Sequence, residues 1–178
     1  MKLSNLEFRT DRLIARSCQI RDALPLADLM APSISRWVAV WPFPISAGQV
    51  EEMLTAYLDA ARAGEFFPAV IVEESSQTII GWLKIEIVES PTRTGELGYW
   101  IGEDFQRRGY AYEVAKGAID FAFNRLDLDS VVAGAQVLNV ASLNMLRKLG
   151  MTRTGKKDVW APSRQRFEEC EYWMLERR

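Results

Sequence analysis

Residues 96–111, ELGYWIGEDFQRRGYA, decide how the chain is expected to fold. They predict a buried strand over 96–101, a short acidic turn, and a loop, 106–111, that opens a long helix. A helix N-terminus offers free backbone N–H groups and the positive end of the helix dipole, so it favours an anion. Gly109 lets a bulky phosphate approach the backbone, and Arg107 and Arg108 add positive charge. We therefore expect an anion site here.

The sequence around this stretch predicts further strands and helices. The helix after residue 45 has the clearest signals, because Ser46 and Gln49 form a capping box and an apolar face runs on to Gly64. A strand, a helix and a second strand in succession make a right-handed crossover, so 96–101 and 130–138 are expected to be parallel. The other expected strands are 11–17, 66–73, 78–89, 151–157 and 166–176, and the other helices are 22–31, 108–125 and about ten residues from 139, with a turn at 90–94.

Length and composition restrict the class of protein. The 178 residues suit one domain, 1–178, and 48% hydrophobic with 26% charged residues is the balance of an ordinary globular protein. The net charge of −2 argues against a dedicated nucleic-acid binder. No apolar run is long enough to span a membrane and the N-terminus lacks a signal-peptide pattern, so we expect no membrane partner and a cytoplasmic location.

The reactive residue types limit the chemistry. The chain has no histidine, which excludes Ser-His-Asp and Cys-His catalysis and removes the commonest metal ligand. Cys18 and Cys170 are far apart and form no CxxC pair, so neither a zinc site nor a disulfide framework is expected. We expect no metal, and any general base has to be a carboxylate, a tyrosine, a lysine or a chain of water molecules.

Segment 33–44 is rich in aromatic residues and proline, with Trp37, Trp41 and Phe43 close together. One interpretation is a loop that packs on the core. The other is an aromatic lip around a substrate cleft, because apolar loop residues often line pockets.

Three motifs together indicate a family. Loop 106–111 fits the pattern Gln/Arg-x-x-Gly-x-Gly/Ala, and an Asn-x-x-Ser at Asn139 and Ser142 and a Lys-Leu-Gly-Met at 148–151 follow it. With the order of strands and helices, these motifs make the chain resemble the GNAT superfamily of acyl-CoA-dependent N-acetyltransferases over nearly its whole length. The strand 96–101 and the Asn-x-x-Ser motif resemble the RimJ/RimL-like branch, which acetylates the N-termini of ribosomal proteins.

The resemblance implies an α+β fold with a mixed sheet of about seven strands, four helices and a central parallel strand pair that splays apart. It also implies acetyl-CoA as co-substrate. The pantetheine arm would pair with the strand end at Trp100, Ile101 and Gly102, and Asn139 would reach the arm from the other side. The pyrophosphate would lie on the loop of Gln106, Arg107, Arg108, Gly109, Tyr110 and Ala111. Each feature also has an ordinary structural explanation, since Gly109 could ease a loop, the arginines could be solvated and Asn139 could only cap a helix.

Acetyl transfer needs an uncharged amine. An α-amino group has a pKa of about 7.7–8.0 and a lysine side chain about 10.4, so near neutral pH far more of the first is uncharged. A chain without histidine therefore fits an N-terminal amine better than a lysine. The alternatives are a small amine, such as an aminoglycoside, a polyamine or an amino acid, and a non-catalytic acyl-CoA-binding module. A homodimer is left open.

Glu96 is the candidate general base, because the family often keeps an acid near the start of the central strand. It could equally be an exposed carboxylate at a strand end, and Glu86 and Glu103 are weaker candidates. For the oxyanion, a backbone N–H near Trp100 or Ile101 is the natural donor.

The residues leave two interpretations for the acid that protonates the departing thiol. Many relatives place a tyrosine seven residues after the asparagine, where this chain has Leu146. In the RimL-like branch the serine of Asn-x-x-Ser is the proposed acid, which is Ser142 here, although such a serine often only bonds locally. A thiol with a pKa near 8.5 can also leave as thiolate without help.

Overall fold

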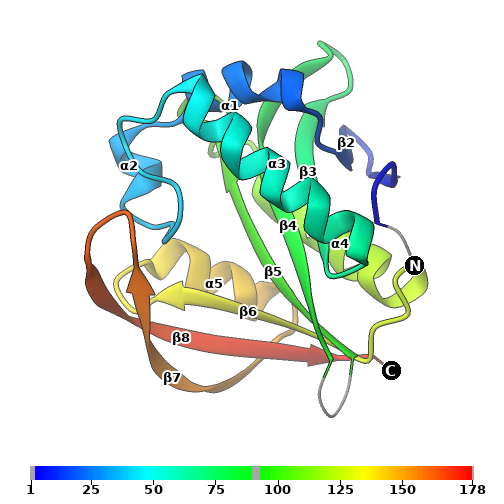
Figure 1. The fold of residues 1–178 in the computed structure, drawn as a ribbon. Coiled ribbons are helices and arrows are strands. Elements are labelled where there is room, and N and C mark those ends of the chain that lie inside the picture. Colours follow the sequence, from blue (N-terminus) through cyan, green and yellow to red (C-terminus); the bar gives the residue numbers. More distant parts are fainter. Residues whose placement is uncertain (1–2, 90–92, 178) are drawn as a thin grey trace.

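Eight strands form one mixed sheet in the order β1-β2-β3-β4-β5-β6-β8-β7 (Figure 1). The computed structural model describes residues 3–89 and 93–177. The strands are β1 (Glu7–Arg9), β2 (Leu13–Ser17), β3 (Phe66–Glu73), β4 (Thr78–Glu89), β5 (Arg93–Ile101), β6 (Ser130–Gln136), β7 (Thr152–Ala161) and β8 (Arg166–Glu176). The helices are α1 (Ala23–Leu29), α2 (Pro32–Ser35), α3 (Ala47–Ala63), α4 (Tyr110–Asn124) and α5 (Val140–Lys148), with 3-10 turns at Ile20–Asp22 and Glu103–Phe105.

Two apolar cores lie on the two faces of the sheet. Apolar residues of α1 and α3 share one core with Trp82 and Trp100. The alanine-rich face of α4 and Leu146 of α5 share the other core with Leu97 and Ile101. Because successive strand residues point to opposite faces, β5 contributes Trp100 to the first core and Ile101 to the second. The sheet thus separates two sides on which different ligands can bind.

Local signals in the sequence explain where the helices begin and end. The Ser46 side chain accepts a hydrogen bond from the Gln49 N–H group at the start of α3, and Gly64 ends that helix with φ 86°. Gly150 follows α5 with φ 80°. Left-handed backbone of this kind favours glycine. The predicted capping box and the glycine stop at Gly64 are confirmed.

The parallel pair β5–β6 splays apart as expected. Its register covers only Thr94 with Ser130, Gly95 with Val131 and Glu96 with Val132. Beyond these pairs β5 continues to Ile101 and β6 to Gln136 without pairing to each other. This gap in the middle of the sheet positions the candidate site.

Some expected elements differ from the observed ones. The sheet has eight strands rather than about seven, because β1 is too short to produce a periodic pattern and forms only through pairing with β2. The expected helix 22–31 is shorter, and a separate helix, α2, begins at Pro32. Proline fits this first position because its missing N–H group would have no partner there. Part of the predicted turn at 90–94 lies outside the described residues, and Arg93 and Thr94 belong to β5.

Candidate functional site

A cavity of about 720 Å³ occupies the gap between β5 and β6. Its walls include β5 from Glu96 to Ile101, the second half of β6, the start of α4, and Asn139 and Ser142 at the start of α5. On the other side of the sheet it reaches the segment 33–41 and the β7–β8 hairpin. The cavity therefore extends from the loop at the start of α4 to the aromatic segment after α1.

The loop at the start of α4 presents unpaired backbone donors. Within residues 3–89 and 93–177, the N–H groups of residues 107–112 donate no hydrogen bond, and Arg107, Arg108 and Gly109 are exposed. Arg107 has φ 61° and Gly109 has φ 82°, with Arg108 between them outside the left-handed region. Alternation of this kind makes successive N–H groups converge into an anion-binding concavity. The loop can therefore accept a phosphate at the positive end of α4.

Side chains hold this loop in place. Gln106 Nε2 donates to the Ile101 carbonyl at 2.9 Å. Arg12 donates to the Arg108 carbonyl at 3.1 Å and pairs with Glu113 at 2.6 Å. The buried Tyr110 donates a hydrogen bond from its hydroxyl to Glu73, which lowers the pKa of that carboxyl. Sequence reasoning missed Arg12, because it lies about a hundred residues before the loop.

The two loop arginines have different surroundings. Arg107 lines the cavity, and in the described part of the chain it forms no ion pair. Arg108 turns back, donating from Nη2 to the Asp104 carbonyl at 2.8 Å, and its guanidinium lies 5.5 Å from the Phe105 ring centroid. Arg107 is therefore the better placed of the two cations for a phosphate in the cavity.

The backbone of β5 turns different groups toward the gap. The Gly102 N–H group donates to the Ile80 carbonyl at 2.8 Å, so it is engaged with the strand edge of β4. In an antiparallel ladder the direction alternates, so the N–H group of Trp100 also faces β4. Those of Tyr99 and Ile101 point away from β4 and lie beyond the last β5–β6 pair, Glu96 with Val132, so they face the gap. Trp100, Ile101 and Gly102 were expected to pair with a pantetheine arm. Of these, only Ile101 directs its N–H group into the gap, and the N–H group of Tyr99 points the same way.

Asn139 and Ser142 both line the cavity at the start of α5. The Asn139 side-chain oxygen accepts a hydrogen bond from the Ser142 N–H group at 3.2 Å, so Asn139 is the helix cap. Among the described residues no hydrogen bond engages the Ser142 hydroxyl. The cap leaves the amide nitrogen of Asn139 and the hydroxyl of Ser142 available to a ligand.

Glu96 lines the cavity where β5 and β6 separate. Lys84 lies between two carboxylates, with its Nζ 3.5 Å from Glu96 and 2.7 Å from Glu86. Glu86 and Glu103 do not line the cavity, and Glu103 instead accepts a hydrogen bond from Ser33. Of the three carboxylates considered as bases, Glu96 is the one that the structure places in the cavity.

The aromatic segment contributes two of its three expected lip residues to the cavity wall. Trp41 is 2% exposed and packs with ring centroids 5.5 Å from Trp82 and 5.1 Å from Trp100. It therefore belongs to the core and also lines the cavity. Trp37 lines the cavity, whereas Phe43 is half exposed and lies outside the lining.

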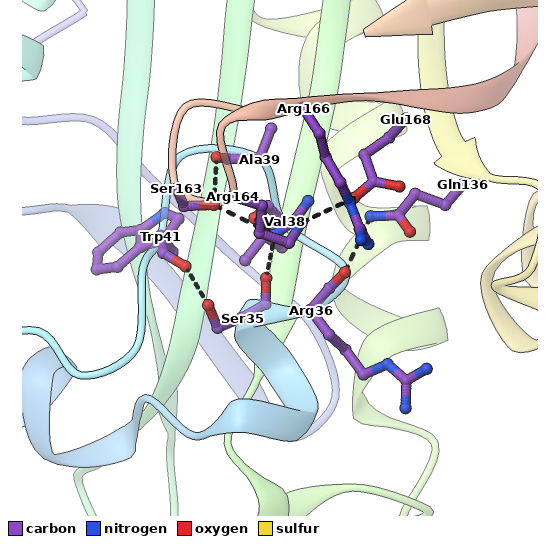
Figure 2. A network of polar contacts seen from close by, with 10 residues as sticks. All are labelled: Ser35, Arg36, Val38, Ala39, Trp41, Gln136, Ser163, Arg164, Arg166 and Glu168. Atoms are coloured by element: carbon purple, nitrogen blue, oxygen red, sulfur yellow. Dashed lines mark hydrogen bonds and ion pairs between the residues drawn. The ribbon is translucent and has the colours of Figure 1, made fainter. Parts of the chain in front are cut away.

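Arg164, in the β7–β8 turn, holds the aromatic segment against the hairpin (Figure 2). Its Nη1 donates to the carbonyls of Ser35 at 2.6 Å and Val38 at 3.0 Å, and its Nε pairs with Glu168 at 2.9 Å. Ser163 adds a hydrogen bond from its hydroxyl to the Ala39 carbonyl at 2.8 Å. We call Arg164, Glu168 and Ser163 the hairpin clamp.

Gln136, at the end of β6, supports the same segment by donating to the Arg36 carbonyl at 2.9 Å. The clamp joins backbone groups more than a hundred residues away in sequence. No motif marks such contacts, so sequence reasoning could not find them. Tyr172 of β8 is another cavity residue that it missed.

The described residues contain no group of three or more His, Cys, Asp or Glu side chains placed to bind a metal ion. Across the described ranges, no helix is both long and apolar enough to cross a membrane.

Comparison with known proteins agrees with this geometry. Residues 12–152 match the family model described as an acetyltransferase (GNAT) domain. The uncharacterized N-acetyltransferase p20 of Bacillus licheniformis is 24% identical over 147 residues, which cover 82% of each chain.

Solved structures share the fold. RimL, a ribosomal L7/L12 α-N-protein acetyltransferase, superposes with a TM-score of 0.85 at 16% identity, covering 97% of this chain and 95% of RimL. RimJ of Mycobacterium smegmatis in complex with CoA-disulfide gives a TM-score of 0.82 at 16% identity, covering 97% of this chain and 86% of RimJ. The chain therefore belongs to the acetyltransferase (GNAT) family and is an N-acetyltransferase that takes acetyl-CoA as its acetyl donor.

Proposed function

We propose that this enzyme acetylates the N-terminal α-amino group of a protein or peptide. The observation that carries the proposal is a continuous path through the sheet. It starts at the unpaired N–H groups of residues 107–112, follows the free edge of β5 and ends at Glu96. A phosphate-bearing donor fits the first part, and an amine that approaches from the opposite face of the sheet would meet Glu96.

Two further observations support this acceptor. RimL, which shares the fold, is named for its action on an α-amino group. The chain has no histidine, and an α-amino group needs only a weak proton acceptor because much of it is uncharged near neutral pH. A ribosomal protein as acceptor would place the enzyme in the cytoplasm, the location we propose.

In this proposal each residue of the cavity has one role in binding or in catalysis. The N–H groups of residues 107–112 and Arg107 hold the pyrophosphate, and the backbone of Tyr99 and Ile101 aligns the pantetheine arm. The Tyr99 N–H group faces the gap and stabilises the developing oxyanion. Ile101 lies five residues, about 16 Å, along the strand from Glu96 and is too far from the base for this role. Glu96 accepts the amine proton, directly or through one water molecule, as the nitrogen attacks the thioester carbon. The C–S bond breaks, the thiolate leaves with its electron pair, and Ser142 is placed to protonate it.

The test is a thiol-release assay with acetyl-CoA and a panel of acceptors. We expect peptides with a free α-amino group to be acetylated and the same peptides with a blocked N-terminus to be inert. Glu96→Gln should lower kcat/KM by about a hundredfold or more and remove the limb of the pH profile that reports the base. Glu86→Gln, which changes the other carboxylate beside Lys84, is the matched control and should stay close to the unmodified enzyme.

The panel also contains polyamines, aminoglycosides and free amino acids. If one of these is turned over and no peptide is, the enzyme acts on a small amine and the N-terminal assignment is wrong. If the pH profile of Glu96→Gln is the same as that of the unmodified enzyme, Glu96 is not the general base.

A further inference from the structure

Tyr172 lies in the cavity and has no part in the scheme above. It pairs with Gly134 across β6 and β8, and a Cβ atom on Gly134 would lie 2.7 Å from Tyr172 Cζ. The end of the phenol ring that carries the hydroxyl therefore covers Gly134. Because the side chain starts on β8 and its ring end has reached β6, the hydroxyl points away from β8, toward the gap between β6 and β5.

The register places Tyr172 on the same face of the sheet as Glu96. Glu96 is the partner of Val132 in β6, and Gly134 follows Val132 by two residues, so both project to one face. Tyr172, as the partner of Gly134, shares that face. Glu96 and the Tyr172 hydroxyl therefore approach the gap from its two sides.

Neighbouring residues position the ring, while the hydroxyl has no partner within the described chain. Lys157 Nζ lies 3.9 Å from the ring centroid, and Gly134 leaves room for the ring end. In residues 3–89 and 93–177 no hydrogen bond engages the Tyr172 hydroxyl. The buried polar side-chain atoms without a partner in those ranges are Nε1 of Trp100 and Trp173 and Nη2 of Arg164, so the Tyr172 hydroxyl remains open to the cavity.

The protonation state of Tyr172 is well defined. Burial, followed by the charges of Glu96 and Cys170, raises the pKa of Tyr172 to about 12. The phenol therefore stays neutral throughout the range in which an amine acceptor becomes uncharged. It can accept or donate a hydrogen bond there, but it does not serve as the base.

We propose that the Tyr172 hydroxyl binds the acceptor nitrogen opposite Glu96 and orients it for attack. This inference rests on the proposed function. The phenol oxygen accepts a hydrogen bond from one N–H of the amine, so the nitrogen lone pair faces the thioester carbon. The N–C bond forms and the C–S bond breaks, and the second amine proton passes to Glu96. Tyr172 keeps its own proton throughout, so its protonation state is the same before and after the reaction.

The decisive variant is Tyr172→Phe, which keeps the ring and its contact with Lys157 and removes only the hydroxyl. We expect kcat/KM for the acceptor to fall about tenfold, the usual effect of one lost hydrogen bond of this kind. The KM for acetyl-CoA should stay within about twofold, and the pH dependence should keep its shape because the base is unchanged.

Two further variants separate this role from general packing. Tyr57→Phe is the matched control, since Tyr57 also lines the cavity, but its ring stacks on Phe66 of β3 with the ring centroids 4.7 Å apart. It should leave acceptor kcat/KM nearly unchanged. Gly134→Ala puts a methyl group where the ring end lies and should reproduce the acceptor defect while Tyr172 is still present.

The inference is wrong if Tyr172→Phe retains full acceptor kcat/KM, or if Tyr57→Phe loses as much. It is also wrong if Tyr172→Phe changes the limb of the pH profile assigned to Glu96. Failure of the proposed function looks different, because the unmodified enzyme would then release no thiol with any peptide.

Discussion

At the scale of single residues, the backbone at Arg107 and Gly109 has an unusual conformation. Both have positive φ, and left-handed backbone costs an ordinary residue roughly 1–2 kcal/mol. Gly109 adopts this conformation without strain because glycine has no Cβ atom, whereas Arg107 is strained. As a result, successive N–H groups of the loop converge on one point. The conformation thus matches an anion site better than a simple loop.

Gly109→Ala tests that account. The nearest atom to a new Cβ would be Arg12 Nη2 at 3.5 Å, so the effect is backbone strain rather than a clash. We expect a loss of about 1 kcal/mol in the free energy of unfolding and a roughly tenfold weaker coenzyme A affinity, measured by denaturant titration and calorimetry.

Gly150→Ala is the matched control for that experiment. Gly150 has φ 80° and open space around it, at the end of α5. It should lose a similar free energy of unfolding and keep its coenzyme A affinity. Equal affinity in both variants would mean that the loop does not hold the pyrophosphate.

At the scale of elements, the β7–β8 hairpin and the segment after α2 behave as one unit. The hairpin clamp joins them through one guanidinium that is 17% exposed and whose partner Glu168 is 15% exposed (Figure 2). Such pairs are costly to break, because the remaining charge is left in a poorly solvated position. The clamp therefore sets the position of Trp37 and Trp41 on the side of the sheet where we propose that the acceptor binds.

Arg164→Gln should separate these two elements. We expect the free energy of unfolding to fall by about 2 kcal/mol and the KM for the acceptor peptide to rise, with coenzyme A affinity unchanged on the other side of the sheet. Unfolding, steady-state kinetics and calorimetry measure the three quantities.

Arg166→Gln is its control. Arg166 pairs with the same Glu168 oxygen at 2.8 Å but is 66% exposed. Because exposed pairs contribute little, this variant should stay close to the unmodified protein. A parallel loss of coenzyme A affinity in Arg164→Gln would show that the clamp does not act on the acceptor side alone.

At the scale of the whole molecule, carboxylates tie distant parts of the chain together. Hydrogen bonds from Tyr110, from Arg177 and from Arg166 lower the pKa of Glu73, Asp127 and Glu168, respectively. For Glu113, burial acts to raise the pKa, but hydrogen bonds from Thr10 and Arg12 outweigh it and lower the pKa. The links of Glu73, Asp127 and Glu113 join segments that are remote in sequence. Arg166 and Glu168 are neighbours within β8.

The pH dependence of stability follows from the sign of these shifts. A carboxylate whose pKa is lower in the folded protein than in the unfolded chain stabilises the folded protein at any pH above its pKa in the unfolded chain. That unfolded pKa is 4.5 for glutamate. That stabilisation is lost as the pH falls through the lower folded pKa. Denaturant titrations between pH 7 and 3 should show the free energy of unfolding decreasing below about pH 4.5.

Glu113→Gln should flatten part of that decrease. It should also be less stable than the unmodified protein at pH 7, where the ionised carboxylate is bound by Arg12. Asp120→Asn, which changes an exposed carboxylate of the same helix, is the matched control. A slope that is identical in all three proteins would rule out Glu113 as a contributor.

The sequence by itself determined the elements whose signals are local. Ser46 and Gln49 predict the start of α3, Asn139 predicts that of α5, and Gly109 with its arginines predicts an anion loop, because caps and left-handed turns depend on a few adjacent residues. The fold class follows from the order of these elements, and the count of about seven strands was one short only because β1 depends on its partner strand.

Only the tertiary structure decided which side chains meet in the gap. Strand register sets the Tyr172 ring over Gly134 and turns Ile101, not Gly102, toward the free edge of β5. Folding likewise brings Arg164 to the carbonyls of Ser35 and Val38. Such contacts depend on the register of strands and on the packing of segments far apart in the chain, and neither leaves a periodic or local pattern in the sequence.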